Sequence, residues 1–286
     1  MASSARLASW RVTVLVLVIL AFDRSFAMGQ VDPWEFEVYP YATHERGLVE
    51  YETLNSYVVQ GHHQGGEGTA AGTFPSQGMW YNSLEFTYGL TDRIEVGGYL
   101  LTGWPDGHGF WFSGAKYRMR GRLFDEDVLP VNLGWYMELE YHKTPQFDDD
   151  ALELELRPIL EKDFGWWSVI LNPIFEKPMF VGPDKNRTLE FGYAMGVYYR
   201  FLPRFSPGVE FYGGSGFITS FDPLPQQQHY VFVVAWGHLG YGIEYNIGPG
   251  FGLTPNSDHV LLKFNLELER FIGALLGPSP AGAWFY

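Results

Sequence analysis

Residues Val131 to Tyr141 read Val-Asn-Leu-Gly-Trp-Tyr-Met-Glu-Leu-Glu-Tyr, and a large apolar side chain occupies almost every second position. The alternate positions include Tyr136, Glu138 and Glu140. Successive side chains of a β-strand point to opposite faces, whereas a helix would mix these residues around its cylinder. The stretch therefore predicts a strand with one apolar face and one polar face.

Eleven further stretches show a similar strand pattern, bounded by turn residues. We predict strands near 48–60, 78–90, 93–103, 109–121, 129–142, 150–162, 166–178, 187–201, 205–217, 228–236, 239–251 and 258–271. Strands of soluble proteins usually have about five or six residues, whereas a tilted strand that crosses a membrane needs about nine to eleven. The lengths favour membrane-spanning strands.

Short and long connections alternate along the chain. The short ones are Thr91-Asp92, 162–165, 202–204 and the region of Gly237, and 122–128 is intermediate. The long ones are 61–77, 104–108, 143–149, 179–186, 218–227 and 252–257. Transmembrane barrels have short periplasmic turns and longer external loops. The sequence thus predicts an all-β fold, a transmembrane antiparallel up-and-down β-barrel of about 12 strands, in which 48–60 runs outward.

A further extended segment, 34–42, precedes these strands and is not needed for a barrel with an even number of strands. It could line the lumen, add a strand at the closure of the barrel or lie in the periplasm.

Aromatic residues gather at the predicted strand ends, as in the girdles of membrane barrels. They are Trp80, Tyr88, Tyr99, Trp104, Trp111, Tyr141, Trp166, Trp167, Phe201, Phe205 and Trp236. Charged residues within the strands fall mostly on one face. The core of a small soluble protein could bury so many charges only if they formed ion pairs or were hydrated. A soluble periplasmic β-protein is the alternative.

We predict that the charged face lines the lumen. Its acids are Glu85, Glu95, Glu138, Glu140, Glu153, Glu155, Glu176, Glu190, Glu210, Glu244, Glu267 and Glu269, and its bases are Lys116, Arg118, Arg120, Arg157, Arg200 and Lys263. An open acidic lumen would favour cations. The other interpretation is a network of paired charges that fills a narrow barrel. Twelve strands lie between barrels that are filled and barrels that leave a channel, so both remain open.

The chain begins with the pattern of a secretory signal peptide. Arg6 and Arg11 precede the apolar run Val12 to Phe22, and Ser25-Phe26-Ala27 resembles a cleavage site. We expect residues 1–27 to be a signal peptide, 28–271 a single outer-membrane barrel domain and 272–286 a C-terminal tail. Cleavage after Ala27 would change the formal net charge from -14 to -16. No later stretch is long and apolar enough for a transmembrane helix.

Composition excludes several classes of protein. The chain has no Cys, which excludes disulfide scaffolds and Cys-based metal centres, and its acidic net charge argues against a nucleic-acid partner. His62-His63 and Asp148-Asp149-Asp150 are weak metal-binding patterns, because adjacent residues on an extended chain point in opposite directions and the acids lack the spacing of a calcium loop. No nucleophile motif is present. We predict no catalytic residues, no metal and no cofactor.

The hairpin Tyr88-Gly89-Leu90-Thr91-Asp92-Arg93-Ile94-Glu95-Val96-Gly97, together with 37–43, 55–58 and Phe251-Gly252-Leu253-Thr254, resembles the Gram-negative outer-membrane family labelled as phenol-degradation (meta pathway) proteins. The resemblance spans nearly the whole mature chain. It implies an outer-membrane barrel for uptake of small, often aromatic or hydrophobic compounds, without established catalytic residues. Barrels of this kind commonly end with an aromatic residue on the last strand, and Phe271 ends the last predicted strand here. The predicted tail, which contains Pro278 and Pro280, follows Phe271 and departs from that pattern.

These observations predict a bacterial outer-membrane protein whose partners are membrane lipids and a small-molecule solute. The first hypothesis is a channel or transporter-like barrel for small solutes, including hydrophobic or aromatic ones. The alternatives are a structural or adhesion barrel that acts through its external loops and a lipid-modifying barrel enzyme. The oligomeric state stays open.

Overall fold

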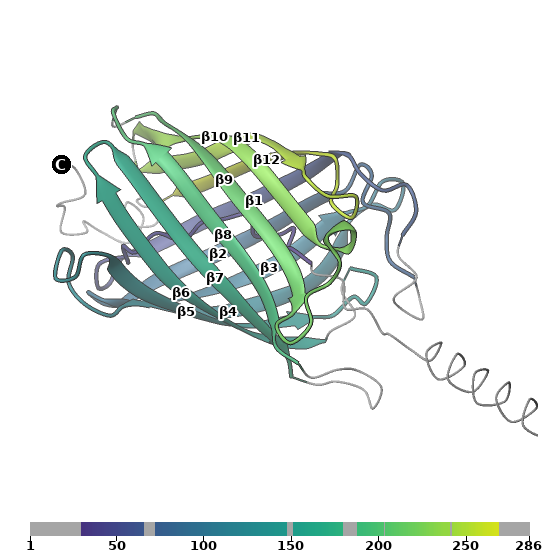
Figure 1. Ribbon diagram of the computed structural model, residues 1–286, viewed down its shortest axis with the longest axis horizontal. Coiled ribbons are helices and arrows are strands. Elements are labelled where there is room, and N and C mark those ends of the chain that lie inside the picture. The colour runs from purple at the N-terminus through teal and green to yellow at the C-terminus, as the bar shows by residue number, and fades with distance from the viewer. Residues whose placement is uncertain are drawn as a thin grey trace, which may run out of the picture.

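The computed structural model describes residues 30–65, 72–147, 151–179, 188–202, 204–240 and 242–268. In these residues twelve antiparallel strands form one closed barrel, in which each strand pairs with its neighbours in sequence and β1 pairs with β12 (Figure 1). The predicted fold class is confirmed. The predicted signal peptide and the predicted tail lie outside the described residues.

The strands are long, as the sequence predicts. They are β1 (Val49–Gln60), β2 (Trp80–Thr91), β3 (Ile94–Trp104), β4 (Trp111–Arg122), β5 (Asn132–His142), β6 (Leu152–Phe164), β7 (Trp167–Pro178), β8 (Glu190–Tyr199), β9 (Ser206–Phe217), β10 (Gln228–Gly240), β11 (Ile243–Gly252) and β12 (Val260–Leu268). A 3-10 turn, η1 (Leu224–Gln226), precedes β10. Within the part of the chain described, no helix is long and apolar enough to cross a membrane.

The turn that was predicted near Gly237 lies elsewhere. Strand β10 continues through Gly237 to Gly240, and the turn follows. Gly240 and Gly242 have φ of +92° and +73°, a region that glycine enters without steric cost. Gly237 instead allows a close approach, because a Cβ at this position would lie 2.3 Å from the carbonyl oxygen of Arg204. The sequence showed a glycine at each position but not which one turns the chain.

The two faces of the wall differ as the alternation predicts. On β5, Met137 and Leu139 are 39% and 41% exposed, whereas Tyr136 and Glu138 on the other face are each 1% exposed. Exposed apolar side chains recur on every strand except β8 and β9, whose outward positions are half-buried, and they suit an outer surface in contact with lipid.

Two of the aromatic residues predicted for the girdles face inward instead. Tyr99 is 2% exposed, and its hydroxyl lies 2.8 Å from that of Tyr39. Trp236 packs against the buried ring of Tyr198 with centroids 5.6 Å apart. Both residues share the parity of buried neighbours on their strands, so alternation, rather than position at a strand end, decides which way a ring points.

The ladder between β6 and β7 has an interruption. Pairing stops at Leu156 with Phe175 and resumes at Leu160 with Leu171. Pro158 and Pro173 occupy this gap, and proline has no N–H to donate to a ladder. This seam is therefore held by fewer backbone hydrogen bonds than its neighbours.

Candidate functional site in the barrel lumen

Residues 30–46, which we call the lumen segment, run through the inside of the barrel from one end to the other (Figure 1, purple). At the end with the long connections, the amide of Val31 donates to Gln228 Oε1 at 2.9 Å. At the end with the short turns, the amides of His44 and Arg46 donate to Glu95 Oε2 at 2.8 Å and Asp92 Oδ1 at 3.3 Å. Of the three places that the sequence left open for 34–42, the structure shows the lumen.

Side chains of the wall hold the backbone of the lumen segment. Asn172 accepts from the amide of Tyr39 at 2.8 Å and donates to its carbonyl at 3.0 Å. Glu161 Oε2 accepts from the amide of Tyr41 at 2.7 Å, and Ser56 Oγ donates to the carbonyl of Pro33 at 2.6 Å. Among the described strands, none forms a ladder with this segment. The buried backbone groups are thus satisfied by single side chains.

One face of the lumen segment is apolar. Trp34, Phe36 and Val38 alternate along it and are 3%, 3% and 6% exposed. The ring of Phe36 lies edge-on to Tyr212 at 5.2 Å between centroids and lies 4.8 Å from Phe232. This packing buries aromatic surface inside the barrel. In an open, hydrated lumen the same rings would be exposed to water.

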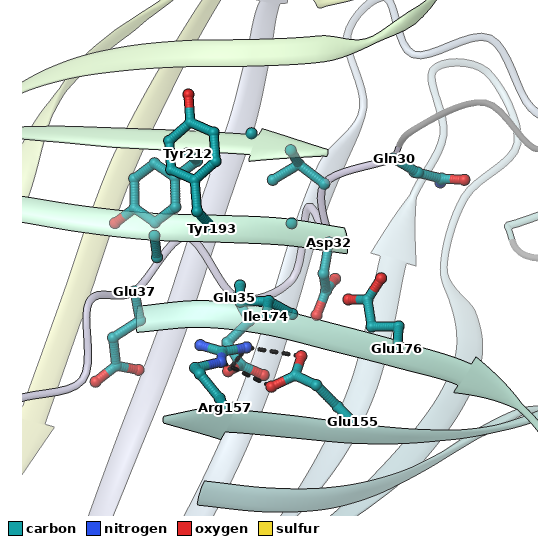
Figure 2. Close-up of a pocket in the computed structure, with 14 residues that line it drawn as sticks. Gln30, Asp32, Glu35, Glu37, Glu155, Arg157, Ile174, Glu176, Tyr193 and Tyr212 are labelled. Carbon is teal, nitrogen blue, oxygen red and sulfur yellow. Dashed lines mark hydrogen bonds and ion pairs between the residues drawn. The ribbon is translucent and has the colours of Figure 1, made fainter. Parts of the chain in front are cut away.

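The opposite face is charged and meets a cluster of basic residues. Lys116 Nζ lies 2.5 Å from Asp32, 2.9 Å from Glu35 and 2.9 Å from Glu138. Arg157 lies 3.2 Å from Glu35 and 2.7 Å from Glu155, and Figure 2 shows its guanidinium between these carboxylates. The segment and the wall are joined by buried ion pairs, which are costly to leave half-made.

A second group of ion pairs lies toward the short turns. Arg118 contacts Glu85 at 2.5 Å and Glu95 at 2.6 Å, and Arg120 contacts Glu95 at 2.9 Å. The ring of Tyr39 lies beside these guanidiniums, 5.6 Å from the carbon of Arg118 and 5.2 Å from that of Arg120. These distances suit cation–π contacts. On the other side of the barrel, buried Lys263 pairs with buried Glu210.

The residues predicted to line the lumen can now be placed. Those buried inside the barrel are Glu85, Glu95, Lys116, Arg118, Arg120, Glu138, Glu155, Arg157, Glu210 and Lys263. Those half-buried are Glu140, Glu153, Glu176, Glu190, Arg200, Glu244 and Glu267. Glu269 lies outside the described residues. The buried bases are each ion-paired, which corresponds to a paired network rather than an open acidic lumen.

Sequence reasoning missed several charged residues of this network. Asp32, Glu35 and Glu37 belong to the lumen segment, and Glu50 and Glu52 belong to β1. The signal for the last two was present, because they alternate with Tyr51 and Thr53 in the same way as the acids of β5.

The lumen leaves little free space beside the lumen segment. A cavity lined by Asp32, Arg157, Glu176 and Tyr193 among others offers about 20 Å³ to the centre of a water-sized sphere. That is room for one or two water molecules. Among the residues that the structure describes, this cavity has no room for a larger solute.

The long connections carry polar contacts of their own, of which those around Ser76 are one example. Ser76 Oγ donates to Asp258 Oδ1, and the amide of His62 donates to Ser76 Oγ at 2.9 Å. Burial raises the pKa of Asp258 above its usual range, while the hydrogen bond from Ser76 acts in the opposite direction. Asp148-Asp149-Asp150 lies outside the described residues.

No family model matches the chain, and no curated protein matches it. Among solved structures it is similar to a COG4313 outer membrane channel from Pseudomonas putida F1, with 14% identity and a TM-score of 0.51 over 84% of this chain and 99% of that chain. Omp33 from Acinetobacter baumannii gives 8% identity and a TM-score of 0.41, covering 79% of this chain and 100% of that one. The TodX deltaS2S3 mutant monoaromatic hydrocarbon channel gives 10% and 0.37, covering 78% and 90%. The first likeness shows the fold, that of an outer-membrane β-barrel.

Proposed function

We propose that this protein is an outer-membrane channel for small solutes, closed in the present arrangement by the lumen segment. The observation that carries the proposal is that a separate extended segment, and not the wall's own side chains alone, fills the centre of the barrel. Barrels of about eight strands are filled by their own side chains, whereas 16 to 18 strands leave a channel. A wall of twelve strands encloses room for an extended chain, and that room becomes a passage when the chain moves.

The attachment of the lumen segment suits movement. It is held by side-chain hydrogen bonds and ion pairs, so that its displacement breaks no ladder bond of the described wall. The barrel can therefore keep its shape while the segment changes position.

The two sides of the emptied lumen would differ in chemistry. One side would present the rings of Tyr212, Tyr230 and Phe232, which Phe36 now covers. The other would present the charged groups around Lys116 and Arg157. Such a passage suits small solutes that combine an aromatic or hydrophobic body with a polar group. The resemblance at the hairpin Tyr88 to Gly97 implies the same class of compound.

A reversible cross-link tests the proposal. Ser56 Oγ already lies 2.6 Å from the carbonyl oxygen of Pro33, and the chain has no Cys of its own. We expect the variant Pro33→Cys/Ser56→Cys to conduct in planar bilayers when reduced, and to be silent when a disulfide ties the segment to β1. Ser56→Cys alone is the control and should not respond to oxidation.

Two results would count against the proposal in different ways. Absence of conductance steps and of solute flux into liposomes, with the protein reduced and folded, would exclude the channel. Conduction that persists in the oxidised double variant, with the disulfide verified by thiol titration, would show that the lumen segment does not close it.

A further inference from the structure

A row of glutamates crosses the closure of the barrel at one level. Glu52 of β1 lies directly opposite Glu85 of β2 on one side and Glu267 of β12 on the other. Glu267 in turn lies opposite Glu244 of β11. Like charges at directly opposed positions of a sheet destabilise it, so this row needs compensation.

Two further carboxylates converge on Glu52. Carboxylate oxygens of Glu37, Glu52 and Glu85 lie within 4.8 Å of one another, and so do those of Glu50, Glu52 and Glu267. We call these five residues the glutamate cluster. Glu37 comes from the lumen segment and the others come from β1, β2 and β12. The cluster therefore joins the segment to the wall.

The neighbouring cations do not neutralise the cluster. Arg118 forms ion pairs with both Glu85 and Glu95, and Arg120 forms an ion pair with Glu95. His44 lies 2.9 Å from Glu50. Among the described residues, no Lys or Arg forms an ion pair with Glu37, Glu52 or Glu267. Within the part of the chain described, these three carboxylates thus form no ion pair with a Lys or Arg.

Buried oxygen atoms point to a missing ligand. Glu52 and Glu85 are 8% and 1% exposed. Oε1 of Glu85 accepts hydrogen bonds from Arg118 Nε and Thr87 Oγ1. Its Oε2 is buried and accepts no hydrogen bond from the described residues. Oε2 of Glu37 is also buried and accepts no hydrogen bond from the described residues. A buried carboxylate oxygen without a donor is costly unless a proton or a cation satisfies it.

We propose that the glutamate cluster binds one Ca²⁺. Its candidate ligand atoms are the carboxylate oxygens of two groups of three residues that share Glu52. Such hard oxygen donors are the set that Ca²⁺ takes six to eight at a time in flexible geometry. Mg²⁺ demands a regular octahedron and keeps several waters, and a softer metal would prefer nitrogen or sulfur ligands. One Ca²⁺ offsets two of the uncompensated charges and ties the lumen segment to the strands that close the barrel. This inference does not depend on the proposed conduction.

The test is a calcium titration of the full chain folded in detergent and freed of metal with a chelator. We expect isothermal calorimetry to show one saturable Ca²⁺ per barrel, with a dissociation constant below about 10⁻³ M. Glu52→Gln should weaken binding at least about tenfold, because Glu52 belongs to both halves of the cluster. Glu176→Gln, a lumen carboxylate outside the cluster, is the matched control and should bind Ca²⁺ like the wild type.

Folding of each variant is checked by heat-modifiable gel mobility, so that loss of binding is not mistaken for loss of the barrel. Without Ca²⁺, Glu52→Gln should melt no lower than the wild type, because it removes a repelling charge. Absence of saturable binding to the folded wild type would overturn the proposal and leave protons as the compensation. An equal loss in Glu176→Gln would overturn it as well. Wild-type affinity in Glu37→Gln would exclude the lumen segment from the site.

Discussion

At the scale of single residues, the interior is organised around a few basic side chains that each serve several acids. Lys116 is the clearest case, since its ammonium reaches Asp32 and Glu35 of the lumen segment and Glu138 and Glu140 of β5. Its side chain is 1% exposed. Removing one member of a buried ionic group leaves the others uncompensated, and this usually costs more than the group contributes as a whole.

We expect Lys116→Met to lower the free energy of unfolding by about 3 to 5 kcal/mol, because Asp32 and Glu138 lose their ion-pair partner while Glu35 and Glu140 keep only Arg157 and His142. Denaturant titration of the refolded barrel in detergent measures this loss. Lys177→Met, at an exposed position of β7, should lower it by less than about 0.5 kcal/mol. Adding Glu35→Gln to Lys116→Met should restore part of the stability. Equal stability of Lys116→Met and wild type would show that solvent reaches this group.

At the scale of elements, the wall was predictable, whereas for 34–42 the sequence predicted an extended segment and left three places open for it. Alternation is a local property, so the strands from β1 to β12 can be predicted wherever apolar and polar residues separate cleanly. Trp34 to Tyr39 alternates in the same manner, and nothing local distinguishes a strand of the wall from an extended chain inside it. The partners of Lys116 were hidden for another reason: Asp32 is 84 residues away, and only the closed barrel brings the two together.

The seam between β6 and β7 is one place where the wall should open more easily than at an unbroken ladder such as β2–β3. Residues 157–159 and 172–174 form no ladder with each other, and each run contains a proline. Arg157 and Asn172 of this seam also hold the lumen segment. The interruption therefore couples a weak part of the wall to the segment that fills it.

Hydrogen exchange tests this description of the seam. Peptides that cover 157–159 and 172–174 should exchange faster than peptides from the β2–β3 ladder, which pairs without a break from Trp80 with Trp104 to Gly89 with Glu95. Replacing Pro158 and Pro173 with Val should slow exchange in the seam and leave β2–β3 unchanged. Uniform protection across both ladders would mean that other contacts hold the seam closed.

At the scale of the whole molecule, the lumen segment fixes the direction of the chain through the barrel. It starts beside Gln228, next to a long connection, and ends beside Asp92 in a short turn. β1 then returns toward the long connections. In outer-membrane barrels the long loops lie outside the cell and the short turns lie in the periplasm. Gln30 should therefore lie at the external end although it precedes the whole barrel in sequence.

Labelling of single cysteines checks this orientation, because the natural chain contains no thiol. Gln30 is exposed, and we expect Gln30→Cys to react with a membrane-impermeant maleimide on intact cells. Glu126, exposed in the turn between β4 and β5, gives the control: Glu126→Cys should react only after the outer membrane is permeabilised. The reverse pattern would invert the barrel and place the entrance to the lumen segment in the periplasm. Protection of both residues on intact cells, with Gln30→Cys reactive in detergent, would show that the segment does not reach the external end.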